Sequence, residues 1–119
     1  MVDATKTKPD NLPAVVRDKC LELADTVLAH EREICIFLFG SRASGRATSR
    51  SDIDLGIDAG HPLAAETMDQ IQETMDSLPI LQRVDCVDFA RLEGNFREMI
   101  LRDCMVIYER TTVVSAPIA

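Results

Sequence analysis

The chain has 119 residues, with 13 basic and 20 acidic side chains and a formal charge of −7. Its hydrophobic fraction of 46% is too high for a disordered chain, and its length predicts a single domain. An acidic chain is a poor general partner for nucleic acid, and no apolar run approaches the roughly 20 residues that span a bilayer or resembles a secretory signal. We therefore expect a cytoplasmic protein that binds neither a membrane nor nucleic acid directly.

Apolar periodicity predicts a mixed α/β (α+β) domain with elements in the order α-β-β-α-β-α-β. The domain is expected at residues 12–110, between a flexible polar arm at 1–11 and an unpatterned tail at 111–119. The expected helices are 12–30, 68–78 and 92–100, and the expected strands are 34–39, 51–58, 84–89 and 104–108. An edge position in the sheet would leave the last strand open to a docking partner.

The cysteines are spread widely along the chain, and most of them lie in apolar segments. No close pair of the kind that zinc sites use is present, so we expect reduced and mostly buried thiols. These residues are Cys20, Cys35, Cys86 and Cys104.

A basic stretch interrupts the acidic sequence after the first expected strand. Gly40 permits unusual backbone dihedral angles and the close approach of a ligand. Ser41 offers a hydroxyl group and neighbouring amides, and a helical turn that begins near Arg42 would add its positive dipole end. This pattern predicts that Gly40, Ser41 and Arg42 bind the phosphates of an anionic ligand.

A pair of carboxylates follows this stretch. Asp52 and Asp54 are two residues apart in an expected strand, which places both on one face, with Cβ atoms roughly 6–7 Å apart. Two such carboxylates need a cation to be desolvated together, and hard oxygen ligands beside phosphate are typical of Mg²⁺. The two stretches together predict a site for a metal-chelated triphosphate, arranged for two-metal in-line displacement.

Two segments carry a resemblance to a known family. Residues 37–57 read FLFGSRASGRATSRSDIDLGI, in which Gly-Ser precedes an acid-apolar-acid-apolar run. This pattern resembles the nucleotidyltransferase superfamily that includes DNA polymerase β, and it is most similar to the minimal nucleotidyltransferases of prokaryotes. Residues 78–110 resemble the closing segment of that family, so the likeness covers residues 12–110. It implies a polymerase β palm-like fold, with a small mixed sheet of about four strands flanked by helices.

The resemblance also implies a set of metal ligands. In the family, the two acids that correspond to Asp52 and Asp54 hold Mg²⁺ on the triphosphate of ATP, and a third acid completes a second metal site. The family pattern puts that acid at Asp85, which would deprotonate or orient the acceptor hydroxyl. Asp88 lies on the opposite face of the same expected strand, near its end, where it is better suited to cap the following helix.

The reaction implied by the resemblance is transfer of a nucleoside monophosphate, AMP from ATP, to a hydroxyl group. The motif and its supporting elements use nearly the whole chain, so little is left to build an acceptor pocket, and we expect the acceptor on a partner protein. The likeness to minimal nucleotidyltransferases implies an antitoxin whose partner is a helical HEPN-type RNase toxin, with a tyrosine hydroxyl as acceptor. Whether the chain also forms a homo-oligomer stays open.

Two alternatives remain at this point. The chain could neutralise the toxin by complex formation alone, without catalysis. It could instead modify a small molecule such as an aminoglycoside, although enzymes of that kind carry an added helical domain.

Overall fold

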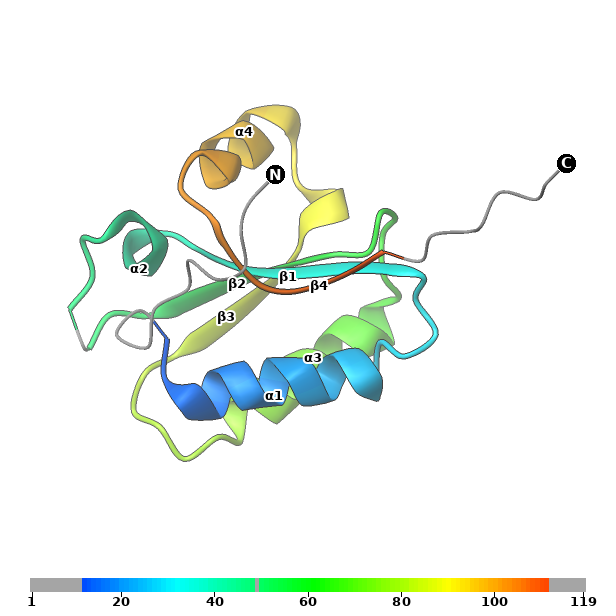
Figure 1. Ribbon diagram of the computed structural model, residues 1–119, viewed down its shortest axis with the longest axis horizontal. Helices are drawn as coiled ribbons and strands as arrows, with labels where there is room; N and C mark the ends of the chain where they lie inside the picture. Colours follow the sequence, from blue (N-terminus) through cyan, green and yellow to red (C-terminus); the bar gives the residue numbers. More distant parts are fainter. Residues whose placement is uncertain (1–11, 49, 112–119) are drawn as a thin grey trace, which may run out of the picture.

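The computed structural model describes residues 12–48 and 50–111, and its centre is a sheet of four strands (Figure 1). The strands are β1 (Glu33–Phe39), β2 (Ile53–Asp58), β3 (Val84–Asp88) and β4 (Met105–Thr111). Their order in the sheet is β3-β2-β1-β4. Strand β1 runs antiparallel to β2 and to β4, whereas β2 and β3 are parallel, which confirms the expected small mixed sheet.

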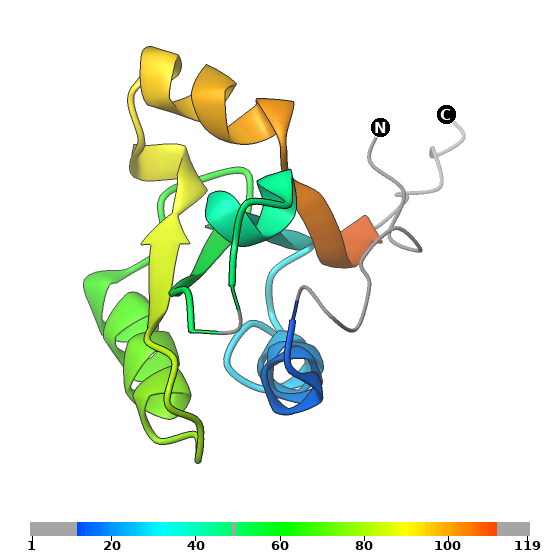
Figure 2. The same cartoon turned by 90° about the vertical axis from the view of Figure 1, so that its left-hand side faces the viewer.

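Helices lie on both faces of this sheet. Helices α1 (Ala14–Asp25) and α3 (Ala65–Asp76) cover one face, and α4 (Gly94–Arg102) lies over the other. Figure 2 looks onto the end of the sheet where the short helix α2 (Ser41–Ser44) follows β1. A 3-10 turn, η3 (Phe89–Arg91), follows β3. Apart from α2, which takes up one turn of the expected loop, and η3, the element order is the one predicted. Among the described residues, no helix is long and apolar enough to cross a bilayer.

Alternation along β2 explains how the two faces differ. Ile53, Leu55 and Ile57 are buried in the larger core, which they share with residues of α1 and α3. The residues between them face α4, where Phe37, Phe39, Phe89 and Ile100 form a smaller cluster. Gly56 leaves room there for the ring of Phe37. Asp54 therefore lies on the face that α4 covers, outside the larger core.

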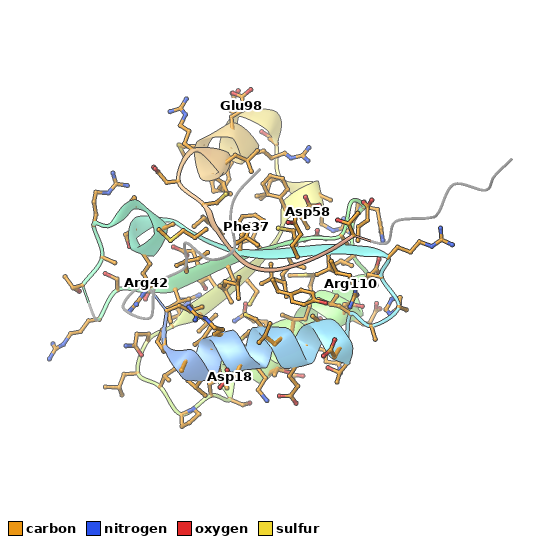
Figure 3. The ribbon with its side chains drawn as sticks, in the orientation of Figure 1. Asp18, Phe37, Arg42, Asp58, Glu98 and Arg110 are labelled. Carbon is orange, nitrogen blue, oxygen red and sulfur yellow. The ribbon has the colours of Figure 1, made fainter. Side chains whose placement is uncertain are left out.

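The helix expected at 12–30 is shorter in the structure at both ends. Its early C-terminal end is explained by contacts with a distant part of the chain. Helix α1 ends at Asp25, and residues 26–30 form turns that return the chain to β1. Arg110, on β4, donates to the carbonyl groups of Ala24 (3.0 Å), Leu28 (2.7 Å) and Glu31 (2.8 Å). Figure 3 shows Arg110 at this end of α1. Apolar periodicity continues through Leu28, but these carbonyl groups accept hydrogen bonds from a distant strand.

Two acids outside the expected site have structural roles, and the capping role of Asp88 is the one predicted. Asp88 accepts hydrogen bonds from the backbone N–H groups of Ala90 (3.3 Å) and Leu63 (2.8 Å), so it caps η3. Asp58 accepts from the N–H of Gly60 (2.9 Å) and closes the turn after β2.

The last strand and the ends of the chain can also be compared with their predicted bounds. Strand β4 is an edge strand, as expected, and it extends to Thr111, the first residue of the expected tail. The arm expected at 1–11 and the rest of the tail lie outside the described residues.

Candidate functional site

The turn after β1 brings the backbone against a carboxylate. Gly40 has a φ of 76°, in the left-handed region that favours glycine. A Cβ atom at this position would collide with the carboxylate of Asp54. The N–H of Ser44 donates to the carbonyl of Gly40 (3.1 Å), so α2 begins directly at Ser41. The predicted Gly-Ser turn therefore lies directly against Asp54 of strand β2.

Arg42 points inward from α2. Its side chain is buried, and its Nε and Nη2 atoms donate to the carbonyl of Ser51 at 3.1 and 2.9 Å. Burial lowers the pKa of the guanidinium group. Arg42 thus ties α2 to the residue just before Asp52, and its position supports the backbone that leads into β2 (Figure 3). The sequence pattern did not predict this contact, because it depends on the path of the intervening loop.

Two of the three expected acids lie side by side. Asp54 on β2 and Asp85 on β3 are register partners in the parallel part of the sheet. Register partners point to the same face of strands that are about 4.8 Å apart. Burial, followed by the negative charges of Asp85 and Asp52, raises the pKa of Asp54. The structure thus concentrates negative charge on the face of the sheet beside Gly40.

Asp52 and Arg83 complete this surface. Asp52 is exposed and precedes the first residue of β2, on the same side as Asp54 by its spacing. The Nε atom of Arg83 donates to Oδ1 of Asp85 at 2.9 Å. Sequence reasoning missed Arg83, although its distance of two residues from Asp85 in an extended segment already places both on one face.

The donor set fits Mg²⁺ in its chemistry. Within the described ranges, no group of three or more His, Cys, Asp and Glu side chains is gathered closely enough to hold a metal ion by itself. Mg²⁺ commonly binds proteins through one or two carboxylates and takes its other ligands from water and substrate phosphate. Asp54 and Asp85 supply such a pair, and Asp52 lies next to it.

A groove opens beside the same turn, between the end of β1 and α4. Its volume is about 440 Å³, and its lining includes Phe39, Gly40, Arg46, Phe96 and Met99. The side chains of Phe96 and Met99 are exposed. This groove joins an apolar surface of α4 to the candidate site.

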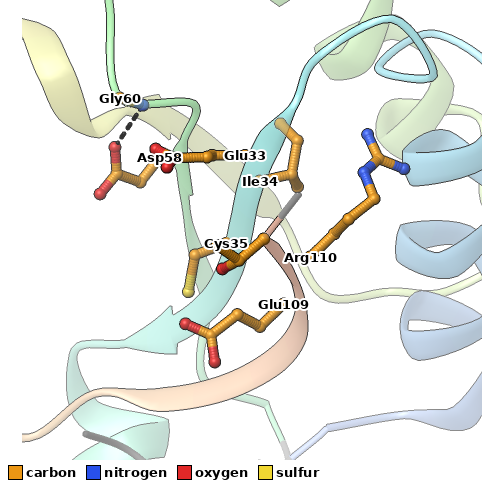
Figure 4. A pocket seen from close by; sticks show the side chains of 8 residues that line it. Glu33, Ile34, Cys35, Asp58, Gly60, Glu109 and Arg110 are labelled. Atoms are coloured by element: carbon orange, nitrogen blue, oxygen red, sulfur yellow. Dashed lines mark hydrogen bonds between the residues drawn. The ribbon is translucent and has the colours of Figure 1, made fainter. Parts of the chain in front are cut away.

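A pocket at the opposite end of β1 has a different character (Figure 4). It has a volume of about 190 Å³, and Glu33, Cys35, Asp58 and Glu109 contribute to its lining. Burial, with the negative charges of Glu109 and Asp58, raises the pKa of the Cys35 thiol to about 12. A thiol that stays protonated at neutral pH is a poor nucleophile. None of the predicted site residues lines this pocket.

Comparisons with known proteins agree with the geometry. The model of the family described as polymerase beta, nucleotidyltransferase, matches residues 22–112. The chain is 31% identical over 105 residues to the probable protein adenylyltransferase MntA of Haemophilus influenzae, covering 87% of this chain and 92% of the relative.

Two solved structures share the fold. A crystal structure of a toxin–antitoxin with AMP-PNP has a TM-score of 0.62 at 21% identity, over 77% of this chain and 72% of that chain. The structure of the tri-AMPylated Shewanella oneidensis HEPN toxin in complex with MNT antitoxin has a TM-score of 0.55 at 18% identity, over 82% and 72%. The Gly-Ser turn, the paired carboxylate strands and these matches lead to one conclusion: the chain belongs to the polymerase beta nucleotidyltransferase family.

Proposed function

We propose that this chain transfers AMP from ATP to a hydroxyl group of a partner protein and serves as the antitoxin of a toxin–antitoxin pair. The observation that carries the proposal is the in-register pairing of Asp54 with Asp85 beside the Gly40 turn. The relative from Haemophilus influenzae supports the reaction, because it carries the name of a protein adenylyltransferase. The toxin–antitoxin complexes that share the fold support the partnership.

The residues of the site divide the proposed work among them. The Ser41 hydroxyl and the turn around it would bind phosphate oxygens of the nucleotide, and Arg42 would keep α2 against the loop before Asp52. Asp52, Asp54 and Asp85 would hold Mg²⁺. When bound, the metal would neutralise the charge that grows on the attacking and leaving oxygens.

The reaction itself is an in-line displacement. The acceptor oxygen forms a bond to the α-phosphorus while the bond between the α-phosphorus and the pyrophosphate oxygen breaks. Asp85 orients the acceptor hydroxyl and receives its proton. Pyrophosphate then leaves from the side of Ser41.

The proposed partner is a helical HEPN-type toxin, and its acceptor is a tyrosine hydroxyl. The MNT antitoxin with the similar fold is in complex with an AMPylated HEPN toxin. The groove beside Gly40 is open and partly apolar, which suits an acceptor that is presented by another protein. ATP is the proposed nucleotide, and Mg²⁺ is the proposed metal.

One observation favours a second candidate, neutralisation by binding alone. Three apolar side chains on α4, Phe96, Met99 and Leu101, are exposed by 45%, 58% and 54%. Phe96 and Met99 are three residues apart on α4 and line the same groove. Exposed apolar side chains that lie together mark protein-binding surfaces, and such a surface needs no nucleotide to cover a toxin.

The two candidates are separated by mass measurement of the partner. A candidate HEPN-type partner protein is incubated with the chain, ATP and Mg²⁺, and its intact mass is expected to rise by whole AMP units. Asp52→Asn combined with Asp54→Asn should abolish the increase and should leave the partner active as a toxin. A double variant that still silences the partner with equal affinity would show that binding, and not transfer, is the function.

A further inference from the structure

The third carboxylate of the site, Asp85, forms an ion pair with Arg83. Arg83 and Asp85 meet at 2.9 Å between Nε and Oδ1, with side chains that are 75% and 37% exposed. The backbone of Arg83 is held in place, because its carbonyl accepts a hydrogen bond from the N–H of Ile53 at 2.8 Å. The backbone of Arg83 is therefore fixed at the start of the β2–β3 ladder, and the guanidinium group can leave Asp85 only by rotation of the side chain.

The surroundings explain why a cation is favourable at this point. Asp54 is the register partner of Asp85, and Asp52 lies two residues before it. The register places the carboxylates of Asp54 and Asp85 on one face of neighbouring strands, where their like charges repel each other. The guanidinium group of Arg83 on Asp85 offsets part of that repulsion when no metal is bound.

From this arrangement we infer that Arg83 acts as an internal counter-ion that competes with the divalent metal for Asp85. The inference rests on the proposed function, since it takes Asp85 as a metal ligand. A metal on Oδ1 of Asp85 would replace the hydrogen bond from Arg83, and a metal on Oδ2 would meet the positive charge of the guanidinium group beside it. Arg83 is a positioning residue in this account: it keeps Asp85 in place in the metal-free protein and lowers the metal affinity of the site.

The expected size of the effect is small and measurable. Exposed ion pairs contribute little, so removal of Arg83 should tighten metal binding roughly two- to five-fold. The opposite expectation applies if Arg83 is only a structural support, because loss of a support would disorder Asp85 and weaken metal binding.

The test uses the full chain without nucleotide and Mn²⁺ as the probe, with free Mn²⁺ counted by electron paramagnetic resonance. Arg83→Gln should bind Mn²⁺ more tightly than the wild type, and Arg83→Lys, which keeps the charge, should stay close to the wild type. Lys19→Gln is the matched control, because it also removes the cation of a surface ion pair (Lys19 with Glu22, 2.6 Å), but from α1 on the other face of the sheet. Its Mn²⁺ affinity should equal that of the wild type.

A second measurement follows the ion pair itself. In nuclear magnetic resonance spectra, the Nε–H signal of Arg83 should shift and exchange faster with water as Mg²⁺ is added. Equal or weaker Mn²⁺ binding by Arg83→Gln, while Asp54→Asn loses Mn²⁺, overturns the role of Arg83 and leaves the proposed function intact. If the wild type fails to bind Mn²⁺, or if Asp54→Asn binds it as well as the wild type does, the metal site and the proposed function fail together.

Discussion

Asp54 and Asp85 lie side by side in register on the parallel strands β2 and β3, and the negative charge of Asp85 adds to burial in raising the pKa of Asp54. The two carboxylates repel each other in the folded protein, and a divalent cation bound between them would offset that repulsion. The site is therefore expected to trade fold stability for metal affinity, as strained functional sites commonly do.

The pH dependence of stability should show this repulsion. Because the pKa of Asp54 is raised in the folded protein, the native state holds its proton at a pH where the unfolded chain has lost it. Stability should thus decrease as pH rises from the unfolded pKa of aspartate through the raised folded pKa. Asp54→Asn should lose this contribution and be more stable than the wild type at pH 7. Urea unfolding between pH 3 and pH 7 checks this, and an identical pH profile for both proteins would contradict it.

Gly40 should be intolerant of any side chain. Gly40→Ala combines a positive φ with a collision against Asp54, so it should both destabilise the fold and abolish AMP transfer. Gly45 is the matched control, because it has a φ of 83° and no atoms within 4 Å of an added Cβ. Gly45→Ala should cost only the backbone strain, about 1–2 kcal/mol. Urea unfolding of the two variants measures the difference, and equal losses would show that Asp54 does not restrict this turn.

Arg42 should protect the loop that precedes Asp52. Arg42→Gln removes the guanidinium group from the Ser51 carbonyl, so the loop should open more often and be cleaved faster by trypsin after Arg46 and Arg50. Mass spectrometry of a limited digest gives the rates, and the affinity for Mg·ATP should fall in parallel. Cleavage at the wild-type rate would mean that the contact does not hold the loop.

Arg110 should stabilise the end of α1. Arg110→Ala leaves the carbonyl groups of Ala24, Leu28 and Glu31 without this donor, and we expect a loss of about 2 kcal/mol in the free energy of unfolding. Arg102→Ala, an exposed change on α4, serves as the control and should have little effect. Chemical denaturation measures the free energy of unfolding of both variants. Equal values for the two would show that Arg110 does not stabilise the end of α1.

Local pattern predicted much of the site. The Gly-Ser turn, the placement of Asp54 on β2 directly after Asp52 and Ile53, and the cap at Asp88 each depend on spacing within a few residues, and the structure has all three. The face on which Asp54 lies also followed from alternation, because Ile53 and Leu55 had to be buried.

Other features depend on contacts between distant segments and could not be found in this way. The pairing of Asp54 with Asp85 requires the register of two strands that are separated by α3. The early end of α1 requires Arg110, which is about 80 residues away along the chain. The inward position of Arg42 requires the loop to return to Ser51. The sequence pattern gave Arg42 a role in phosphate binding, which stays a prediction.

Calorimetric titration with AMP-PNP in the presence of Mg²⁺ tests the central claim most directly, namely that the carboxylate pair beside Gly40 holds a metal-bound triphosphate. The wild type should bind the nucleotide only when Mg²⁺ is present. Asp54→Asn should lose at least roughly ten-fold in affinity, because even residues that only support metal ligands change metal affinity by about 10- to 100-fold. A wild-type protein that fails to bind, or an Asp54→Asn variant that binds equally well, would contradict the account.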